Sequence, residues 1–138
     1  MILLDTDTLS LLFRGQPRVE ARVRSAQSDV TTTVVTWIEV LQGRFDALLK
    51  AANADQLERA YRRLHDSVQQ LARLTIVAIG RPAAEQFEKL LRSKKLKKIG
   101  RGDLFIASIA LAEQATLASR NLRDFKQIPG LKVENWAD

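Results

Sequence analysis

Four acidic residues that lie far apart in the chain stand at positions from which carboxylates could act together. Asp5 follows the short apolar run Ile2–Leu4, Glu39 lies inside an amphipathic stretch, Asp103 directly precedes the most apolar segment, and Asp124 follows another apolar run. A carboxylate at the end of a buried strand is costly to bury without a partner. Asp5 is therefore the residue on which a predicted acidic site would be built.

Such a site requires compensation for its own charge. Two unit charges about 4 Å apart repel each other by roughly 4 kcal/mol at an effective dielectric constant of 20. If Asp5, Glu39, Asp103 and either Asp124 or Asp7 share one cleft, several carboxyl groups bind protons or a divalent cation binds among them. Oxygen ligands favour Mg²⁺ or Mn²⁺ over zinc or copper. Such an ion activates water and shields phosphate oxygens, which is the chemistry of metal-dependent phosphodiester hydrolysis.

Most of these residues also have an explanation that involves no active site. Asp7 or Thr6 would cap the first expected helix, and Asp103 would cap the apolar helix that follows it. Asn121 and Asp124 have the spacing of a capping pair at the start of a short helix. The functional interpretation therefore depends on the convergence of these residues and not on any one of them.

Glu39 on its own would be a solvated residue on the polar side of an amphipathic helix. Three- and four-residue spacing places it on one helix face with Thr36 and Gly43. A glycine inside a helix costs about 1 kcal/mol relative to alanine. Gly43 therefore predicts that another group approaches this face closely.

A strongly basic segment comes immediately before Asp103. Residues 89–101 contain seven Lys and Arg side chains and no acidic one. Cations at a helix end offset the helix dipole, but this effect explains seven of them poorly. The whole chain has a net charge of +6 and a pI of about 10.1, which suits a polyanionic partner. We expect phosphate contacts from Lys94, Lys95, Lys97, Lys98 and Arg101.

The composition excludes several kinds of site. The chain contains no cysteine, which rules out disulfides, thiolate zinc sites and cysteine nucleophiles, and its one histidine, His65, is expected at a helix surface. A length of 138 residues predicts a single domain over residues 1–138. No apolar stretch approaches the length of a membrane span, and the first residues lack the features of a secretion signal, so we expect a cytoplasmic protein.

The elements that must position these residues alternate along the chain. Short apolar runs predict strands over residues 2–4, 75–79, 116–119 and 131–134. Helices are predicted over residues 8–14, 18–25, 33–52, 57–71, 82–93 and 104–112. This order predicts an α/β fold with a parallel sheet covered on both faces. Functional groups in such sheets gather at the carboxyl ends of the strands.

The two long central helices are predicted to be amphipathic. Their apolar residues recur at spacings of three and four and are expected to pack, as are the aromatic residues Trp37 and Trp136. The first stripe comprises Val34, Ile38, Leu41, Phe45 and Leu48, and the second comprises Leu57, Tyr61, Leu64, Val68 and Leu71.

Taken in order, these motifs resemble those of the PIN-domain ribonucleases, and within them the VapC-type toxins of bacterial toxin-antitoxin pairs. The matching segments are residues 1–7, 36–43, 102–110, 119–125 and 128–131, so the resemblance covers nearly the whole chain. It implies a three-layer α/β/α sandwich with a central, mainly parallel sheet. It also implies that Asp5, Glu39 and Asp103 bind Mg²⁺ or Mn²⁺.

The resemblance implies further site residues. The fourth acidic position of the family matches residues 121–124, where relatives have Asp in place of Asn121 or have Asn followed by an acid, so either Asn121 or Asp124 approaches the metal. Thr6 and Ser119 match small hydroxyl residues that border the family site. Asp7 stands where Asn is commoner and adds negative charge.

The function implied by the resemblance is that of a Mg²⁺- or Mn²⁺-dependent endoribonuclease, the toxin of a toxin-antitoxin pair. Such an enzyme hydrolyses RNA phosphodiester bonds with a metal-activated water. The resemblance also implies a homodimer, and a small VapB-like antitoxin whose tail blocks the cleft.

Two other functions compete with this one. In a haloacid-dehalogenase-type phosphatase Asp5 would form an aspartyl-phosphate, but Leu9 stands where that family has Thr or Val, and Ala107 and Ser108 stand where it has an acid. A non-catalytic PIN-like module would bind nucleic acid through the basic segment alone. The complete acidic set argues against that module.

Overall fold

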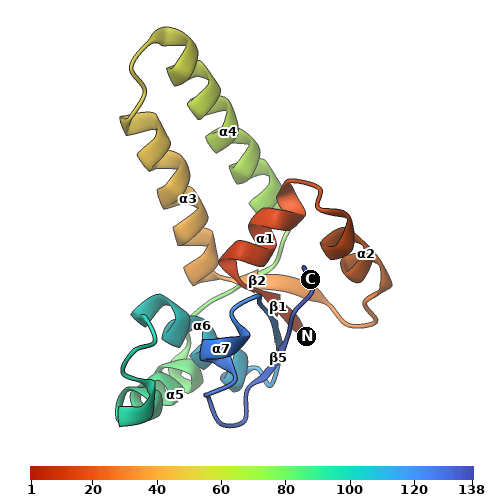
Figure 1. Cartoon of the computed structure of the whole chain (residues 1–138), viewed down its shortest axis with the longest axis vertical. Coiled ribbons are helices and arrows are strands. Elements are labelled where there is room, and N and C mark those ends of the chain that lie inside the picture. Colours follow the sequence, from red (N-terminus) through yellow and green to blue (C-terminus); the bar gives the residue numbers. More distant parts are fainter.

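Five short parallel strands form one sheet in the computed structural model, which describes all residues 1–138 (Figure 1). The strand order is β3-β2-β1-β4-β5. Leu4 pairs with Thr32 on one side and Ala118 on the other, so the carboxyl ends of the three central strands meet at one edge. The predicted α/β class is confirmed, with a sheet that is entirely parallel. The strands are β1 (Ile2–Leu4), β2 (Val30–Thr33), β3 (Ile76–Val77), β4 (Thr116–Ala118) and β5 (Lys132–Glu134).

Helices connect the strands and start close to the predicted positions. Pro17 and Pro82 lie in the first turn of their helices, where a missing N–H has no partner to lose. None of the helices combines the length and apolar character needed to cross a bilayer. They are α1 (Thr6–Phe13), α2 (Pro17–Ser25), α3 (Val34–Leu49), α4 (Ala54–Ala72), α5 (Arg81–Leu91), the 3₁₀ helix η1 (Lys94–Leu96), α6 (Arg101–Ala112) and α7 (Leu122–Phe125).

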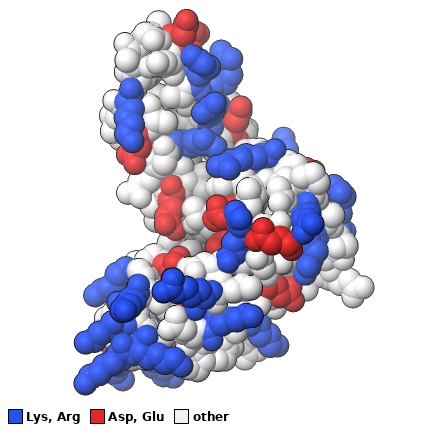
Figure 2. Space-filling model, in the orientation of Figure 1, with Lys and Arg blue, Asp and Glu red and all other residues white.

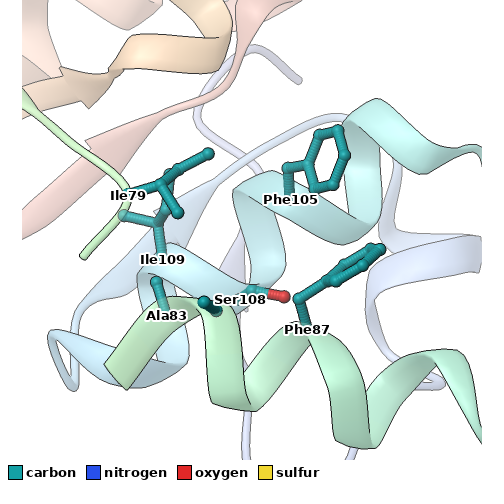
Figure 3. A pocket seen from close by; sticks show the side chains of 7 residues that line it. Ile79, Ala83, Phe87, Phe105, Ser108 and Ile109 are labelled. Atoms are coloured by element: carbon teal, nitrogen blue, oxygen red, sulfur yellow. The ribbon is translucent and has the colours of Figure 1, made fainter. Parts of the chain in front are cut away.

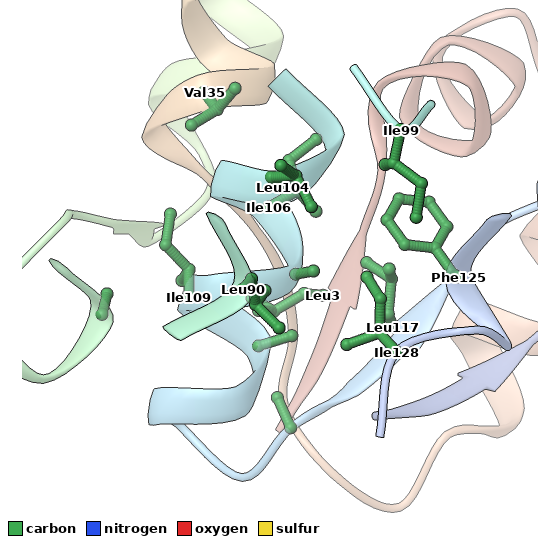
Figure 4. Packing of buried hydrophobic residues seen from close by; sticks show 14 of the residues in the cluster. Leu3, Val35, Leu90, Ile99, Leu104, Ile106, Ile109, Leu117, Phe125 and Ile128 are labelled. Carbon is green, nitrogen blue, oxygen red and sulfur yellow. The ribbon is translucent and has the colours of Figure 1, made fainter. Parts of the chain in front are cut away.

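Alternate residues of the central strand face opposite layers. Leu3 belongs to a core with Leu117 and the apolar side chains of α5 and α6, as Figure 4 shows. Leu4 belongs to a second core with Leu9 of α1 and Leu71 of α4. Successive side chains of a strand point to opposite faces, so both faces of the sheet are covered. The three-layer α/β/α architecture is thus confirmed.

Strand β2 was not among the predicted strands, because its sequence is dominated by threonine. Thr31, Thr32 and Thr33 are all buried. Two of their hydroxyl groups form hydrogen bonds to distant parts of the chain. Thr32 donates to the carbonyl of Leu4 at 2.6 Å, and Thr31 donates to the carbonyl of Thr75. β-branched threonine favours strands, but its buried position follows from these tertiary hydrogen bonds and not from apolar patterning.

The hairpin formed by α3 and α4 projects from the body of the molecule (Figure 1). The two helices pack on each other, yet Ile38 is 47% exposed and Phe45 is 54% exposed. Trp37 and Tyr61 are also exposed, whereas Trp136 is buried. The prediction that the apolar stripes pack is therefore wrong for these side chains within one chain, because no other layer covers the outer part of the hairpin.

Truncation of a sheet leucine should destabilise the protein far more than truncation of a hairpin leucine. Leu117 is fully buried and Leu49 is 68% exposed. We expect Leu117→Ala to lower the free energy of unfolding by about 2–5 kcal/mol and Leu49→Ala to change it by less than about 0.5 kcal/mol. Urea unfolding monitored by circular dichroism measures both. Equal losses in the two variants would contradict the assignment of the core.

Candidate active site

Asp5 ends strand β1 and is almost completely buried, with 7% of its surface exposed. It is the N-cap of α1, because the backbone N–H of Thr8 donates to Asp5 Oδ1 at 2.9 Å. The expectation that Asp7 or Thr6 caps this helix is wrong, since α1 begins at Thr6. Burial raises the pKa of Asp5, and hydrogen bonds from Ser119 and Thr8 oppose that rise.

Glu39 is held by a threonine pair at the start of α1 and α3. Thr6 Oγ1 donates to Glu39 Oε1 at 2.8 Å and lies 3.1 Å from Thr36 Oγ1. Thr36 is buried, whereas Glu39 is exposed. The sequence placed Thr36 and Glu39 on one helix face, but it contained no signal for the link to Thr6, which depends on how α1 packs against α3.

The close approach expected at Gly43 occurs at another glycine. A Cβ atom at Gly43 would meet nothing within 4 Å, so that expectation is wrong within this chain. A Cβ atom at Gly102 would lie 3.6 Å from Glu39 Oε2. Gly102 belongs to the first turn of α6 and therefore brings the start of that helix against the Glu39 carboxylate.

Asp103 is the third residue of α6 and does not cap it. Gly100 occupies the N-cap position and provides no side-chain cap, which corrects the capping explanation. Burial raises the pKa of Asp103, and the negative charges of Asp5, Glu39 and Asp124 raise it further, in that order. The other three predicted carboxylates therefore lie near enough to Asp103 to raise its pKa, and all four share one region of the molecule.

Asn121 joins two of these carboxylates. It caps α7 by accepting a hydrogen bond from the backbone N–H of Asp124 at 3.4 Å, so the predicted capping pair is confirmed. Its Nδ2 donates to Asp124 Oδ2 at 3.1 Å and lies 3.4 Å from Asp103 Oδ2. Its own N–H donates to Ser119 Oγ at 2.9 Å. Asn121, Asp124 and Ser119 all lie at the carboxyl end of β4, as expected.

No basic side chain neutralises the four carboxylates. Asp5, Glu39, Asp103 and Asp124 take part in none of the ion pairs of the structure. Asp7 differs from them, because its side chain is 60% exposed and lies 3.6 Å from Arg120. No three acidic side chains converge closely enough to coordinate one ion in their present positions. The site is therefore a region of uncompensated negative charge.

The basic segment lies beside this acidic region. Figure 2 shows Lys and Arg side chains gathered over the α5 end of the molecule, with acidic side chains beyond them. None of the five predicted phosphate-contacting residues forms an ion pair, whereas Arg92 is paired with Glu88 at 3.2 Å. The guanidinium of Arg101 lies 5.6 Å from the centre of the Phe87 ring. The five unpaired residues are Lys94, Lys95, Lys97, Lys98 and Arg101.

An apolar cavity between α5 and α6 is separate from this site (Figure 3). It has a volume of about 100 Å³ and is lined by Ile79, Phe87, Phe105 and neighbouring small residues. Its one hydroxyl group, on Ser108, donates to the carbonyl of Leu104 at 2.7 Å. The cavity therefore offers no free polar group that would orient a substrate.

Comparison with known proteins gives consistent matches over the whole chain. A family model described as PIN domain matches residues 2–131. Ribonuclease VapC2 of Haemophilus influenzae is 28% identical over 137 residues, which cover 97% of this chain and 96% of that protein. The tRNA(fMet)-specific endonuclease VapC of Salmonella typhimurium is 25% identical over 135 residues, with the same coverage of both. The structure of VapBC2 from Rickettsia felis, bound to a promoter DNA fragment, superposes with a TM-score of 0.74 at 26% identity and covers 99% of both chains.

The raised pKa of Asp103 predicts how stability depends on pH. A carboxyl group whose pKa is higher in the folded than in the unfolded chain favours folding while it is protonated, and this contribution is lost as the pH rises through the raised pKa. In EDTA we therefore expect Asp103→Asn to increase the free energy of unfolding at pH 7. The variant should also lose less stability than the parent protein as the pH rises above 3.8, the ordinary pKa of an Asp carboxyl group.

Urea unfolding at a series of pH values measures this effect. Asp46→Asn is the matched control, because Asp46 is an exposed residue of α3 outside the acidic site. The control should retain the pH profile of the parent protein. A loss of stability in Asp103→Asn at pH 7 would contradict the electrostatic interpretation.

Proposed function

The chain belongs to the PIN-domain family, and we propose that it is an endoribonuclease toxin of the VapC type that requires Mg²⁺ or Mn²⁺. One observation carries this proposal: Asp5, Glu39 and Asp124 gather around Asp103 without any basic partner, and together with burial they raise its pKa. The relatives named as ribonucleases match over nearly the whole chain. RNA is therefore the substrate that we propose for the acidic site.

The donor set suits a hard divalent cation in its chemistry. Asp5, Glu39, Asp103 and Asp124 offer only oxygen atoms, and their charge has no counter-ion within the chain. For one ion to contact several of these carboxylates, some of the side chains would have to rotate. Glu39 has room to do so because it is exposed. A bound Mg²⁺ or Mn²⁺ would supply the charge that lowers the pKa of a water molecule and shields phosphate oxygens.

The remaining residues of the site orient these carboxylates. Thr6 donates its hydroxyl proton to Glu39, and Ser119 and the N–H of Thr8 hold Asp5. Asn121 donates to Asp124. Hydrogen bonds of this kind fix the direction of ligand oxygens in metal sites.

The unpaired lysines next to α6 would bind RNA phosphates on one side of the acids. Asp7, which is exposed and paired with Arg120, contributes charge at the edge of the site.

The alternatives receive less support. The PIN-domain match over residues 2–131 argues against the phosphatase, in which Asp5 would be the nucleophile. A purely RNA-binding module would have no use for the buried Asp5 and the half-buried Asp103, because burial of each carboxylate costs folding free energy. Hydrolysis explains their retention and binding alone does not.

A protein partner also forms part of the proposal. The Rickettsia felis structure is a complex of two proteins, VapB and VapC, and we propose that this chain likewise binds a VapB-like antitoxin and forms a homodimer. The exposed apolar side chains of the α3–α4 hairpin support such contacts, since exposed apolar patches mark interaction surfaces. They include Trp37, Ile38, Phe45, Leu57, Tyr61 and Val68.

Cleavage of RNA should depend on the acidic residues and on a divalent cation. We expect the purified protein to cleave total RNA in Mg²⁺ or Mn²⁺ and to stop when EDTA is added. Asp5→Ala or Asp103→Ala should reduce the rate at least about a hundredfold, since the charge stabilisation lost is worth several kcal/mol. Asp7→Asn should change it less than about fivefold, because Asp7 forms only an exposed ion pair. Gel analysis of labelled RNA measures the rates.

Thermal unfolding provides a readout that does not depend on activity. Mg²⁺ should raise the midpoint of the parent protein, because a ligand that binds only the folded state stabilises it. The same addition should leave the midpoint of Asp103→Ala nearly unchanged. Cleavage that continues in EDTA, or an equal Mg²⁺ effect on both proteins, would overturn the proposed metal site.

Replacement of Lys94, Lys95, Lys97 and Lys98 by Gln should weaken RNA binding and reduce its salt dependence. Each lost phosphate contact lowers the slope of log K against log salt by about 0.7–0.9. Fluorescence anisotropy at several salt concentrations measures this slope. The control variant has the same net charge but replaces Arg14, Lys50, Arg73 and Lys132, which are exposed, form no ion pair and lie outside residues 89–101. An equal change of slope in both variants would show that only net charge matters.

A further inference from the structure

A second group of cations lines a groove on the α3–α4 hairpin, away from the basic segment. Arg44 of α3 and Arg59 and Arg63 of α4 border this groove, which has a volume of about 270 Å³. The remaining lining residues are Gln56 and the small Ala47 and Ala60. Figure 2 shows Lys and Arg side chains over the hairpin, on the opposite side of the acidic residues from those at α5. We call this feature the arginine groove, defined by Arg44, Arg59 and Arg63.

Helical spacing and one hydrogen bond build the groove. Arg59 and Arg63 are four residues apart and therefore lie on one face of α4. Arg44 Nε donates to the buried Ser67 Oγ at 3.0 Å, which fixes the direction of its guanidinium from the second helix. Its two terminal nitrogens have no partner within the chain. Alanine at positions 47 and 60 leaves the space between the helices open.

None of the three arginines is neutralised. The ion pairs of the structure involve Arg22, Arg24, Arg81, Arg92 and Arg120 only. Although α4 also carries Asp55, Glu58 and Asp66, none of these forms an ion pair with a groove arginine. A guanidinium group presents several donors in one plane and matches the geometry of a phosphate. Three unpaired guanidinium groups thus provide a binding site for a polyanion.

The lining favours a nucleic-acid backbone over a protein segment. The binding energy of protein interfaces comes mainly from a few buried anchors, most often Trp, Tyr and Arg, and the groove contains neither Trp nor Tyr. The exposed aromatic residues of the hairpin, such as Phe45 and Tyr61, are not part of its lining. Phosphate contacts require no apolar anchor and derive from charge alone.

The groove lies on the same helix as one of the site carboxylates. Arg44 follows Glu39 by five residues, which is about 7 Å along the axis of α3. Val40, one turn before Arg44, belongs to the core cluster that contains Leu9 of α1. Five residues also turn α3 by about 140°, so the groove opens on a different face of the helix from the Glu39 carboxylate.

We propose that the arginine groove binds the phosphate backbone of RNA at a distance from the cleaved bond. This inference rests on the proposed function of the acidic site. RNA that is long or folded enough to reach the groove would gain contacts that a short oligonucleotide cannot make. The groove would therefore favour extended or structured RNA without taking part in hydrolysis.

The test compares two charge-matched double variants of the full chain. Arg59→Gln with Arg63→Gln removes two groove cations, and glutamine keeps the helix propensity of α4. Arg62→Gln with Arg73→Gln removes two exposed cations that do not line the groove. Binding of a labelled transfer RNA is measured by anisotropy in EDTA, and cleavage of a short single-stranded oligonucleotide is measured in Mg²⁺.

We expect the groove variant to bind transfer RNA about tenfold more weakly and to lower the salt slope by about 1.5. The control variant should change affinity by less than about twofold, and both variants should cleave the short oligonucleotide as fast as the parent. Equal weakening in both variants, or no weakening in either, would overturn the groove proposal. Poly-L-glutamate serves as an acidic polypeptide probe: if the groove variant loses this probe but keeps its RNA affinity, the groove binds a protein segment instead.

The two proposals fail in different ways. If the parent protein cleaves no RNA, the proposed hydrolytic function fails, while the binding comparison in EDTA still decides whether the groove contacts RNA. If the parent cleaves RNA but the groove variant binds and cleaves every substrate normally, only the groove proposal fails. Circular dichroism of both variants confirms that α4 remains folded.

Discussion

Uncompensated negative charge at the carboxyl edge of the sheet is the constraint on which the rest of the molecule depends. Parallel pairing of β1 with β4 brings Asp5 next to Ser119 and the β4–α7 turn. The start of α6 adds Asp103 to the same edge, and α3 adds Glu39. Such crowding lowers the stability of the fold in the absence of a cation. The structure tolerates it through hydrogen bonds from neutral donors, namely Thr6, Asn121 and the N–H of Thr8.

Because the hydrogen-bond donors to these carboxylates are neutral, they do not compensate the charge of the site. A lysine or arginine among the carboxylates would lower their pKa values, but it would also occupy the position that a cation needs. Hydroxyl and amide groups orient the carboxylate oxygens without cancelling their charge. Arg120 pairs with the exposed Asp7 and with none of the four central carboxylates. The charge of these carboxylates is thus not compensated within the chain.

The sequence predicted the elements that carry apolar patterning and missed those that depend on tertiary contacts. The strands at both ends and the buried helix α6 follow from short apolar runs, and their order led to the parallel sheet. Strand β2 was missed because it consists largely of threonine: Thr31 and Thr32 donate hydrogen bonds to distant backbone carbonyls, and Thr33 caps α3. Exposure of Ile38 and Phe45 was missed because periodicity shows which face of a helix is apolar, not whether this chain alone covers it.

The residues of the candidate site were likewise predicted where residue type and position along the chain were informative, and missed where contacts between elements decide their role.

The residue types and their strand-end positions predicted Asp5, Asn121 and Asp124. Capping roles for Asp7 and Asp103 were wrong because Asp5 and Gly100 take those positions, which only the observed start of each helix reveals. Gly102, against Glu39, was not singled out by spacing, since its role arises from the contact between α6 and α3.

In the proposed function, RNA binding and RNA hydrolysis rely on different charges. Without a cation the acidic edge repels a phosphate group, so the RNA backbone would be attracted by the basic segment before α6 and by the arginine groove. Because those cations lie outside the carboxylate cluster, their attraction does not depend on the metal. In the proposed function, each divalent cation bound at the acidic edge would offset two of the four carboxylate charges and so reduce the repulsion that a phosphate group meets near Asp5 and Asp103. The two sets of charges would then have separate roles, because the basic residues would bind RNA with or without the cation, whereas hydrolysis would also require it.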